Sequence, residues 1–302
     1  MSASPDIAAL PRRWPEPAAL LRLLKPITWF PPMWAYLCGI VSSGAALGAD
    51  PVALALGVAL AGPVVCGMSQ AANDWCDRHV DAINEPDRPI PSGRVPGRWG
   101  LWVALAMTVL ALALGIRLGP WGWAAVAAAC VAAWAYSAEP ARLKRSWLWG
   151  PGLVGLSYET LPWITGAVVL SGGAAPDARV LIVALAYGIG AHGIMTFNDF
   201  KAEAGDRAMG IRSLPAAFGP ARAARIACAV MLAPQLAVVL ALTAWGAPWH
   251  AAAIAVLIAA QLAAMARVLT DPERLAPWFN GTGVALSVAG MMVAALALRG
   301  LA

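Results

Sequence analysis

Residues 73–93 read NDWCDRHVDAINEPDRPIPSG, an acidic stretch that directly follows about twenty apolar residues. Its carboxylates Asp74, Asp77 and Asp81 are spaced i, i+3 and i+7, so on a helix they project from one face. Like charges on one face repel, and the pattern predicts a hard divalent cation bound by oxygen. Mg²⁺ that keeps water and phosphate ligands fits best, and Asn73 adds a neutral oxygen. The alternative is an ordinary solvated loop, which is disfavoured because loops beside apolar spans normally gather Lys and Arg.

A second polar stretch, residues 198–215, reads NDFKAEAGDRAMGIRSLP and also follows a long apolar run. Asp199, Glu203 and Asp206 fall at i, i+4 and i+7, again on one helical face. Together the two stretches predict two metal ions, or one metal shared between facing helices, that clamp a pyrophosphate. The alternative for this second stretch is a set of plain helix salt bridges. Its other candidate binding residues are Asn198, Lys201 and Arg212.

The composition indicates a membrane protein. The 302-residue chain is 60% hydrophobic and only 12% charged, with a mean hydropathy of +0.68, whereas a soluble domain carries roughly a quarter charged residues. The net charge of +5 does not indicate a nucleic-acid partner, because the positive residues are distributed over loops between apolar segments. The five cysteines lie in or beside apolar segments without paired spacing, as small buried side chains do.

Nine apolar segments are long enough to cross a bilayer core of ~30 Å, for which roughly 20 residues are needed. They cover residues 28–47, 52–72, 99–116, 121–137, 149–170, 179–198, 222–244, 248–269 and 279–298. The predicted fold is therefore an all-α membrane protein with nine transmembrane helices. An interfacial segment over residues 1–26 precedes a single polytopic transmembrane domain over residues 27–302.

The charges in the predicted loops orient the chain in the membrane. If the N-terminus and every second loop lie on one side, that side carries 18 of the 21 Lys and Arg residues. Cytoplasmic loops are enriched in these residues, so the N-terminus is predicted to be cytoplasmic and the C-terminus to lie on the opposite side. Both acidic stretches then lie on the cytoplasmic side, at the ends of the second and sixth spans.

Basic residues near the acidic stretches are candidates for holding a phosphorylated substrate. Prolines stiffen the segment after the first stretch and Gly93 permits a sharp turn, so that Arg88 and Arg94 would be held in place. The loop at residues 136–146 reads YSAEPARLKRS, and its cations suit a diphosphate. The alternative is plain anchoring at the cytoplasmic surface. The candidates from this loop are Tyr136, Arg142 and Lys144.

Glu159 is the only acid predicted deep in a span, and His192 lies within another; such groups are costly in a membrane and often functional. Glu159 either contributes to a pocket or is protonated and hydrogen-bonded to Ser157 or Thr160. His192 is interpreted first as a buried, hydrogen-bonded histidine, and alternatively as a polar contact or an axial ligand for a bound substrate. The sequence contains no Gly-rich phosphate loop, no Ser/His/Asp set and no zinc spacing.

These features together favour one kind of substrate, a prenyl diphosphate. A divalent cation and basic side chains would hold its diphosphate at the cytoplasmic surface, while a lipid-shielded cavity takes its hydrocarbon tail. Ionisation of the allylic carbon requires the charge on the leaving pyrophosphate to be stabilised, which is electrostatic and metal catalysis.

Both acidic stretches resemble signatures of the UbiA superfamily of intramembrane prenyltransferases. The resemblance covers nearly the whole chain and implies nine helices around a central cavity, with the active site toward the cytoplasm. The loop at residues 136–146 resembles the family's loop between spans four and five. The residues that match the first signature form the pattern Asn73-Asp74-x-x-Asp77-x-x-x-Asp81.

The second signature differs from its usual form, which is Asp-x-x-x-Asp. Asp206 matches its last residue, but Ala202 stands four residues earlier. This leaves open whether Asp199 or Glu203 takes the missing ligand role. The resulting NDFKAEAGD, together with NDWCDRHVDAINEPDRPIPSGR, is similar to the chlorophyll and bacteriochlorophyll synthase branch.

That branch implies an acceptor, the propionate of a (bacterio)chlorophyllide, which receives a geranylgeranyl or phytyl group. A carboxylic acid with a pKa near 4 is already ionised at about pH 7, so the reaction needs no general base. The branch also implies a photosynthetic bacterial inner membrane, and association with other pigment-biosynthesis or light-harvesting assembly proteins. The alternatives are prenylation of an aromatic ring, as in quinone biosynthesis, and a pigment-binding or transport protein without catalysis.

Overall fold

The computed structural model describes residues 14–46, 48–171, 174–208 and 210–302. Most of the predicted interfacial segment, residues 1–13, lies outside the described residues; the rest of it contains one short helix, α1. The described residues form helices and no strand; the pairing of Ser146 with Arg212 is an isolated bridge. The α-helices are α1 Pro17–Leu23, α2 Phe30–Ser42, α3 Pro51–Ala59, α4 Gly67–Asn84, α5 Trp99–Gly115, α6 Gly119–Ser137, α7 Trp149–Gly155, α8 Leu161–Val169, α9 Ala178–Asp199, α10 Glu203–Ala208, α11 Leu214–Phe218, α12 Pro220–Ala244, α13 Pro248–Val268, α14 Pro272–Gly281 and α15 Gly283–Leu301.

Short segments of other helical types connect several of these helices. They are the 3₁₀ turns η1 Pro26–Thr28, η3 Ile116–Leu118, η4 Leu143–Arg145 and η6 Phe200–Ala202, and the π-helices η2 Leu60–Cys66 and η5 Leu156–Thr160. Because η2 contains Pro63, which has no N–H to donate, the wider π turn relieves the clash that a proline causes inside an α-helix.

Six helical stretches in the described part of the chain are long and apolar enough to cross a membrane. They are Pro51–Asn84, Trp99–Ser137, Ala178–Ala202, Pro220–Ala244, Pro248–Val268 and Pro272–Leu301. The stretch Trp99–Ser137 reverses at Gly119, whose φ of 75° ends η3, and its two halves α5 and α6 pack against each other. The protein is therefore an all-helical, multi-pass membrane protein.

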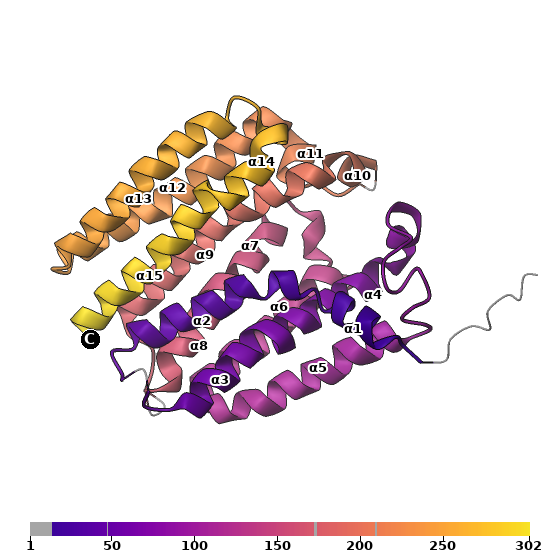
Figure 1. Ribbon diagram of the computed structural model, residues 1–302, viewed down its shortest axis with the longest axis horizontal. Coiled ribbons are helices and arrows are strands. Elements are labelled where there is room, and N and C mark those ends of the chain that lie inside the picture. Colours follow the sequence, from indigo (N-terminus) through magenta and orange to yellow (C-terminus); the bar gives the residue numbers. More distant parts are fainter. Residues whose placement is uncertain (1–13, 47, 172–173, 209) are drawn as a thin grey trace, which may run out of the picture.

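The longest continuous helix carries the first acidic stretch out of the bundle. α3, η2 and α4 together span 34 residues, or roughly 50 Å at the usual rise per residue. This exceeds the ~30 Å core of a bilayer, so the acidic end of α4 projects beyond the apolar region. Figure 1 shows the end of α4 and helices α10 and α11 at the right-hand end of the molecule, away from the C-terminus.

Glycines allow the neighbouring helices to approach closely. α2 packs on α8, where a Cβ on Gly39 would collide with the carbonyl of Trp163. α7 packs on α9, where a Cβ on Gly155 would collide with the carbonyl of Gly188. Small residues are the usual means of close helix packing in membranes, where lipid and side chains are equally apolar. These crossings place α9, which leads into the second acidic stretch, beside α7.

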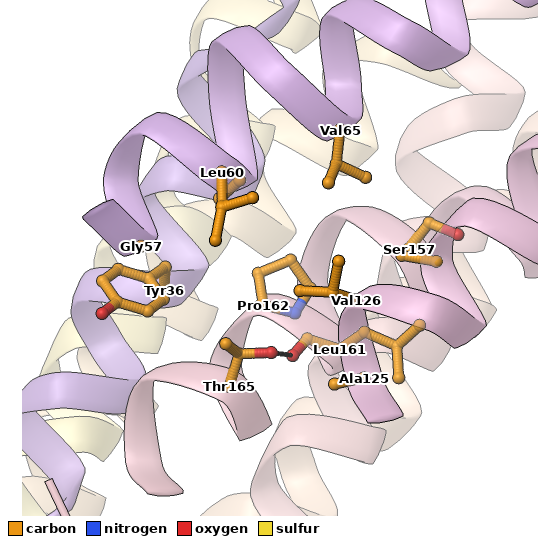
Figure 2. A pocket seen from close by; sticks show the side chains of 12 residues that line it. Tyr36, Gly57, Leu60, Val65, Ala125, Val126, Ser157, Leu161, Pro162 and Thr165 are labelled. Carbon is orange, nitrogen blue, oxygen red and sulfur yellow. Dashed lines mark hydrogen bonds between the residues drawn. The ribbon is translucent and has the colours of Figure 1, made fainter. Parts of the chain in front are cut away.

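A small cavity lies among α2, α6, η2 and the segment from η5 to α8, with Tyr36, Leu60, Pro162 and Thr165 in its wall (Figure 2). Its volume of about 30 Å³ suffices for one or two water molecules and not for a prenyl chain. A larger hollow of about 570 Å³ follows α5 and α6, and its lining includes Thr108 and Leu112 of α5 and residues between Trp123 and Ala141.

Candidate active site

The buried carboxylate of the first acidic stretch, Asp74, is held by two cations from other parts of the chain. Its Oδ1 accepts hydrogen bonds from Lys25 Nζ at 2.7 Å and from Arg88 Nη1 at 3.3 Å. The side chain is only 2% exposed. Its second oxygen, Oδ2, has no hydrogen-bond partner among the described residues. Asp74 therefore keeps one free acceptor in a charged, buried setting.

Asp77 turns toward the loop that follows α6. Its Oδ1 accepts from Arg142 Nη2 at 3.0 Å, and its Oδ2 accepts from Lys144 Nζ. Burial lowers the pKa of Lys144, and the adjacent Asp77 charge opposes this effect. The basic loop predicted as a diphosphate clamp thus contacts the acidic helix directly.

Arg88 joins the remaining carboxylates of this stretch. It donates to Asp81 Oδ2 at 3.0 Å and to both oxygens of Glu85 at 2.6 and 2.8 Å. The hydrogen bonds from Arg88 lower the pKa of Glu85. Together with the residues above they form what we call the charge cluster: Lys25, Asp74, Asp77, Asp81, Glu85, Arg88, Arg142 and Lys144.

Two other predicted residues of this stretch have local partners. Arg94, predicted to bind substrate, donates to Ser92 Oγ at 3.0 Å and to the carbonyl of Asp87. It is held by its own loop, and no ion pair to the acidic helix is found for it among the described residues. Asn73 donates to Ser137 Oγ at 3.3 Å, at the end of α6.

The second acidic stretch combines a buried acid with helix salt bridges. Glu203 forms an ion pair with Arg207 at 2.7 Å. This pair is of the kind expected if the second stretch carries plain helix salt bridges. Asp206 is 9% exposed, and burial raises its pKa. Asn198 Oδ1 accepts from Asn280 at 2.9 Å.

The outer residues of this stretch are exposed. Lys201 is exposed and lies within electrostatic reach of Glu85. The exposed Arg212 is joined to the basic loop through its backbone, whose N–H donates to the carbonyl of Arg145 at 3.1 Å.

The two acidic stretches converge at one end of the bundle. The Tyr136 hydroxyl lies within electrostatic reach of Asp77 from the first stretch and of Asp199 and Asp206 from the second. Burial raises the pKa of Asp206, and the positive charge of Lys144, which also binds Asp77, opposes that rise. Residues 122 positions apart in the sequence, Asp77 and Asp199, are thus brought to a single region, since α4 packs on α6, α6 on α7 and α7 on α9.

The structure departs from the expected shared metal face. Within the described ranges, no group of three or more His, Cys, Asp or Glu side chains is arranged to hold a metal ion. The reason is the pairing: Asp74 and Asp81 turn toward Arg88, whereas Asp77 turns toward Arg142. The common helical face predicted from the i, i+3 and i+7 spacing is therefore divided between two sets of cations.

Glu159 and His192 lie in the interior. Glu159 is 5% exposed, and its Oε2 has no hydrogen-bond partner in the described part of the chain. The expected partner Thr160 instead donates to the carbonyl of Ala184. His192 is 8% exposed, and neither ring nitrogen is hydrogen-bonded to a described residue. The burial of His192 agrees with its interpretation as a core histidine, and its role in binding stays a prediction.

Sequence reasoning did not assign several residues that shape this region. Lys25 was counted only among the charges that orient the chain, although it forms a 2.7 Å pair with Asp74 across 49 positions. Ser137 and Asn280 are hydrogen-bonded to the asparagines that begin the two acidic stretches, Asn73 and Asn198. Long-range partners of this kind leave no local periodicity or spacing from which they could be found.

Comparison with known proteins agrees with this arrangement. The model of the UbiA prenyltransferase family matches residues 31–297. The chain is 62% identical over 298 residues to the "Bacteriochlorophyll synthase 33 kDa chain" of Cereibacter sphaeroides, covering 99% of this chain and 98% of that protein. It is 58% identical over 302 residues to the protein of the same description from Rhodobacter capsulatus, covering 99% of each.

Solved structures share the fold at much lower sequence identity. A UbiA homologue from Archaeoglobus fulgidus, solved bound to DMAPP and Mg²⁺, superposes with a TM-score of 0.64 at 20% identity, covering 89% of this chain and 98% of that one. The family model, which extends from residue 31 to residue 297, includes both acidic stretches. The chain therefore belongs to the UbiA prenyltransferase family.

Proposed function

We propose that this prenyltransferase esterifies the propionate of a (bacterio)chlorophyllide with a geranylgeranyl or phytyl group taken from the prenyl diphosphate, releasing pyrophosphate. The observation that carries the proposal is the 62% identity, over almost all of both chains, to a bacteriochlorophyll synthase chain. The convergence of both acidic stretches with the basic loop supports it, because these groups suit a diphosphate leaving group.

Mg²⁺ is the proposed cofactor, and the residues present fit it. The free Oδ2 of buried Asp74 offers the metal an acceptor, and the free Nε of partly buried Arg142 offers a donor to the diphosphate, both without partners among the described residues. A set of carboxylate oxygens is the chemistry that Mg²⁺ prefers. When bound, the ion would neutralise charge that develops on the leaving pyrophosphate. The proposed ligands are Asp74, Asp77, Asp81, Asp199, Glu203 and Asp206.

The chain's own residues position the diphosphate and stabilise it as a leaving group. Arg142 presents a planar guanidinium that can bind two phosphate oxygens, and Lys144 supplies a point charge. Arg88 is held by three carboxylates, so its direction is fixed before substrate binds. The further proposed contacts are Asn73, Arg94, Tyr136, Glu159, His192, Asn198, Lys201, Glu203 and Arg212.

The acceptor needs no base from the protein. A propionic acid with a pKa near 4 is ionised at about pH 7, so its carboxylate can attack the allylic carbon directly. Exclusion of water then decides between ester formation and hydrolysis. The proposed location of the reaction is the cytoplasmic side of a nine-span protein in a photosynthetic bacterial membrane, with the N-terminus in the cytoplasm.

Incubation of purified protein with labelled geranylgeranyl diphosphate and either bacteriochlorophyllide or 4-hydroxybenzoate tests the acceptor. We expect labelled ester only with the pigment. Turnover of the benzoate alone would instead support prenylation of an aromatic ring.

Substitution of the first acidic stretch tests catalysis itself. We expect Asp77→Ala combined with Asp81→Ala to abolish almost all ester formation while the protein still inserts into membranes. The physical reason is loss of both the proposed metal ligands and the partners of Arg88, Arg142 and Lys144. Unchanged product yield from this double variant, measured by chromatography of extracted pigment, would overturn the proposed metal clamp at Asp77 and Asp81.

A further inference from the structure

The charge cluster is close to internal balance. Its four carboxylates, on one helix and the residue after it, face four cations from three other segments. Glu139, which also pairs with Arg142, is matched by its own partner Arg145. Asp74 and Asp77 each meet two of these cations, while Arg88 meets three carboxylates. Most of these side chains are at least partly buried, so an added charge would not be fully screened by water.

This balance of charge disfavours the binding of a divalent cation alone and the binding of a diphosphate alone. A divalent cation brought to Asp74 or Asp77 meets the ammonium and guanidinium groups already bound to them. A diphosphate brought to the cations meets the same carboxylates. A cation and a diphosphate brought together carry opposite charges, so the region regains its balance if the protein's cations move to the phosphate oxygens.

Two of these cations have an unfavourable backbone conformation. Lys25 has φ 46° and Arg142 has φ 35°, and they are the residues other than glycine with positive φ in the described part of the chain. Left-handed backbone is unfavourable for such side chains and persists where surrounding contacts maintain it. Both residues lie in connections between helices, whereas their partners Asp74 and Asp77 are fixed on α4.

We propose that Lys25, Arg88, Arg142 and Lys144 exchange partners during binding, leaving the carboxylates of α4 for the oxygens of the diphosphate. The carboxylates become available to the divalent cation in the same event. Metal and diphosphate therefore bind as a mutually dependent pair, each raising the affinity for the other by the same factor. Lys25, which the sequence did not identify as a site residue, acts here as a positioning residue. This inference rests on the proposed function, which supplies the diphosphate and the metal.

Mn²⁺ in place of Mg²⁺ makes the coupling measurable without turnover. The electron paramagnetic resonance signal of free Mn²⁺ is titrated with purified full-length protein, with and without pyrophosphate, against a protein-free blank that accounts for the Mn²⁺–pyrophosphate complex. We expect pyrophosphate to raise the Mn²⁺ affinity of the wild-type protein by on the order of tenfold. Equal affinity with and without pyrophosphate would overturn the proposal.

Lys25→Met tests the exchange at a single pair. Removing this cation frees Asp74, so Mn²⁺ should bind several-fold more tightly without pyrophosphate, and the enhancement by pyrophosphate should shrink. Lys25→Arg keeps the charge and should retain the wild-type pattern. Arg78→Met is the matched control: it removes one positive charge from α4, where Arg78 contacts Trp75 and no carboxylate partner is found for it among the described residues.

The outcomes separate exchange from other roles. If Lys25→Met weakens Mn²⁺ binding while the protein remains folded, Lys25 supports the carboxylate and does not compete for it, and the proposal fails. If Arg78→Met strengthens Mn²⁺ binding as much as Lys25→Met does, the effect is one of net charge, and the proposal also fails. If pyrophosphate raises the Mn²⁺ affinity of the wild-type protein but the protein forms no pigment ester, the proposed function fails and the proposed exchange of partners stands.

Discussion

At the scale of single residues, polar side chains in this apolar chain work mainly through their neighbours. Asp50, Asp177 and Asp271 each accept a backbone hydrogen bond at the start of a helix, α3, α9 and α14 respectively. The first N–H groups of a helix have no partner within it, so each of these carboxylates satisfies a donor that would otherwise be exposed to lipid headgroups or buried.

Asp177 gives a pH-dependent prediction. Its Oδ1 accepts from the backbone N–H of Arg179 at 2.7 Å, and the Arg179 guanidinium binds both of its oxygens. These bonds lower the pKa of Asp177. A carboxylate whose pKa is lower in the folded state stabilises that state above its unfolded pKa, near 3.9. This stabilisation is lost as the pH falls through the folded pKa.

We expect Asp177→Ala to lower the free energy of unfolding by about 1 kcal/mol near neutral pH, as loss of a helix cap does. Thermal unfolding in detergent at a series of pH values measures this difference. The gap between variant and wild type should close as the pH falls toward the acid limit of the folded protein. Asp177→Asn keeps a capping oxygen and should recover most of the loss at neutral pH. A gap that widens on acidification would contradict the assignment.

At the scale of elements, glycine spacing decides which helices can touch. Gly155 and Gly152 lie on the same helix, α7, but only Gly155 faces the backbone of α9 at Gly188. A Cβ at Gly152 would meet no described atom within 4 Å. The two positions therefore form a matched pair that separates helix contact from helix propensity.

We expect Gly155→Ala to destabilise the protein by roughly 1–3 kcal/mol, because the added methyl forces α7 and α9 apart. Gly152→Ala should be neutral or stabilising by roughly 0.5–1 kcal/mol, since alanine favours helix more than glycine does. Unfolding temperature in detergent reports both. Equal effects of the two substitutions would show that the close crossing of α7 and α9 does not limit stability.

The helices themselves could be predicted because the bilayer fixes their length and composition. Each predicted span overlaps a helix of the structure, for example residues 179–198 and α9. The π-helices η2 and η5 could not be predicted, because they arise where proline or packing interrupts an otherwise ordinary apolar run. The spacing of the acids correctly predicted that they lie on a helix. It could not predict that Arg88 and Arg142 draw these acids apart, because the two arginines lie 7 and 65 positions away from the acids they bind.

At the scale of the whole molecule, the number of membrane spans depends on whether short, interrupted or reversing helices are each counted as a span. Length and composition alone give six stretches, but Trp99–Ser137 reverses at Gly119 and comprises two helices. α2, with 13 residues, and the interrupted helix from Trp149 to Val169 fall outside that count. Both pack against helices of the bundle, α2 on α8 and α7 on α9. Counting both of them as spans would give the nine that the sequence predicts, and that number stays a prediction.

The two counts place the C-terminus on different sides of the membrane. With the N-terminus cytoplasmic, an even number of spans returns the chain to the cytoplasm, whereas nine spans leave Ala302 outside. A reporter enzyme that is active only outside the cytoplasm, fused after Ala302 or after Leu118, should therefore be active in both positions. The same reporter fused after Pro91, beside the charge cluster, should be inactive. An inactive fusion after Ala302 with an active one after Pro91 would invert the orientation and move both acidic stretches to the outer face. Because the diphosphate is charged and the active site must meet it from water, that single result would also decide from which compartment the substrate is drawn.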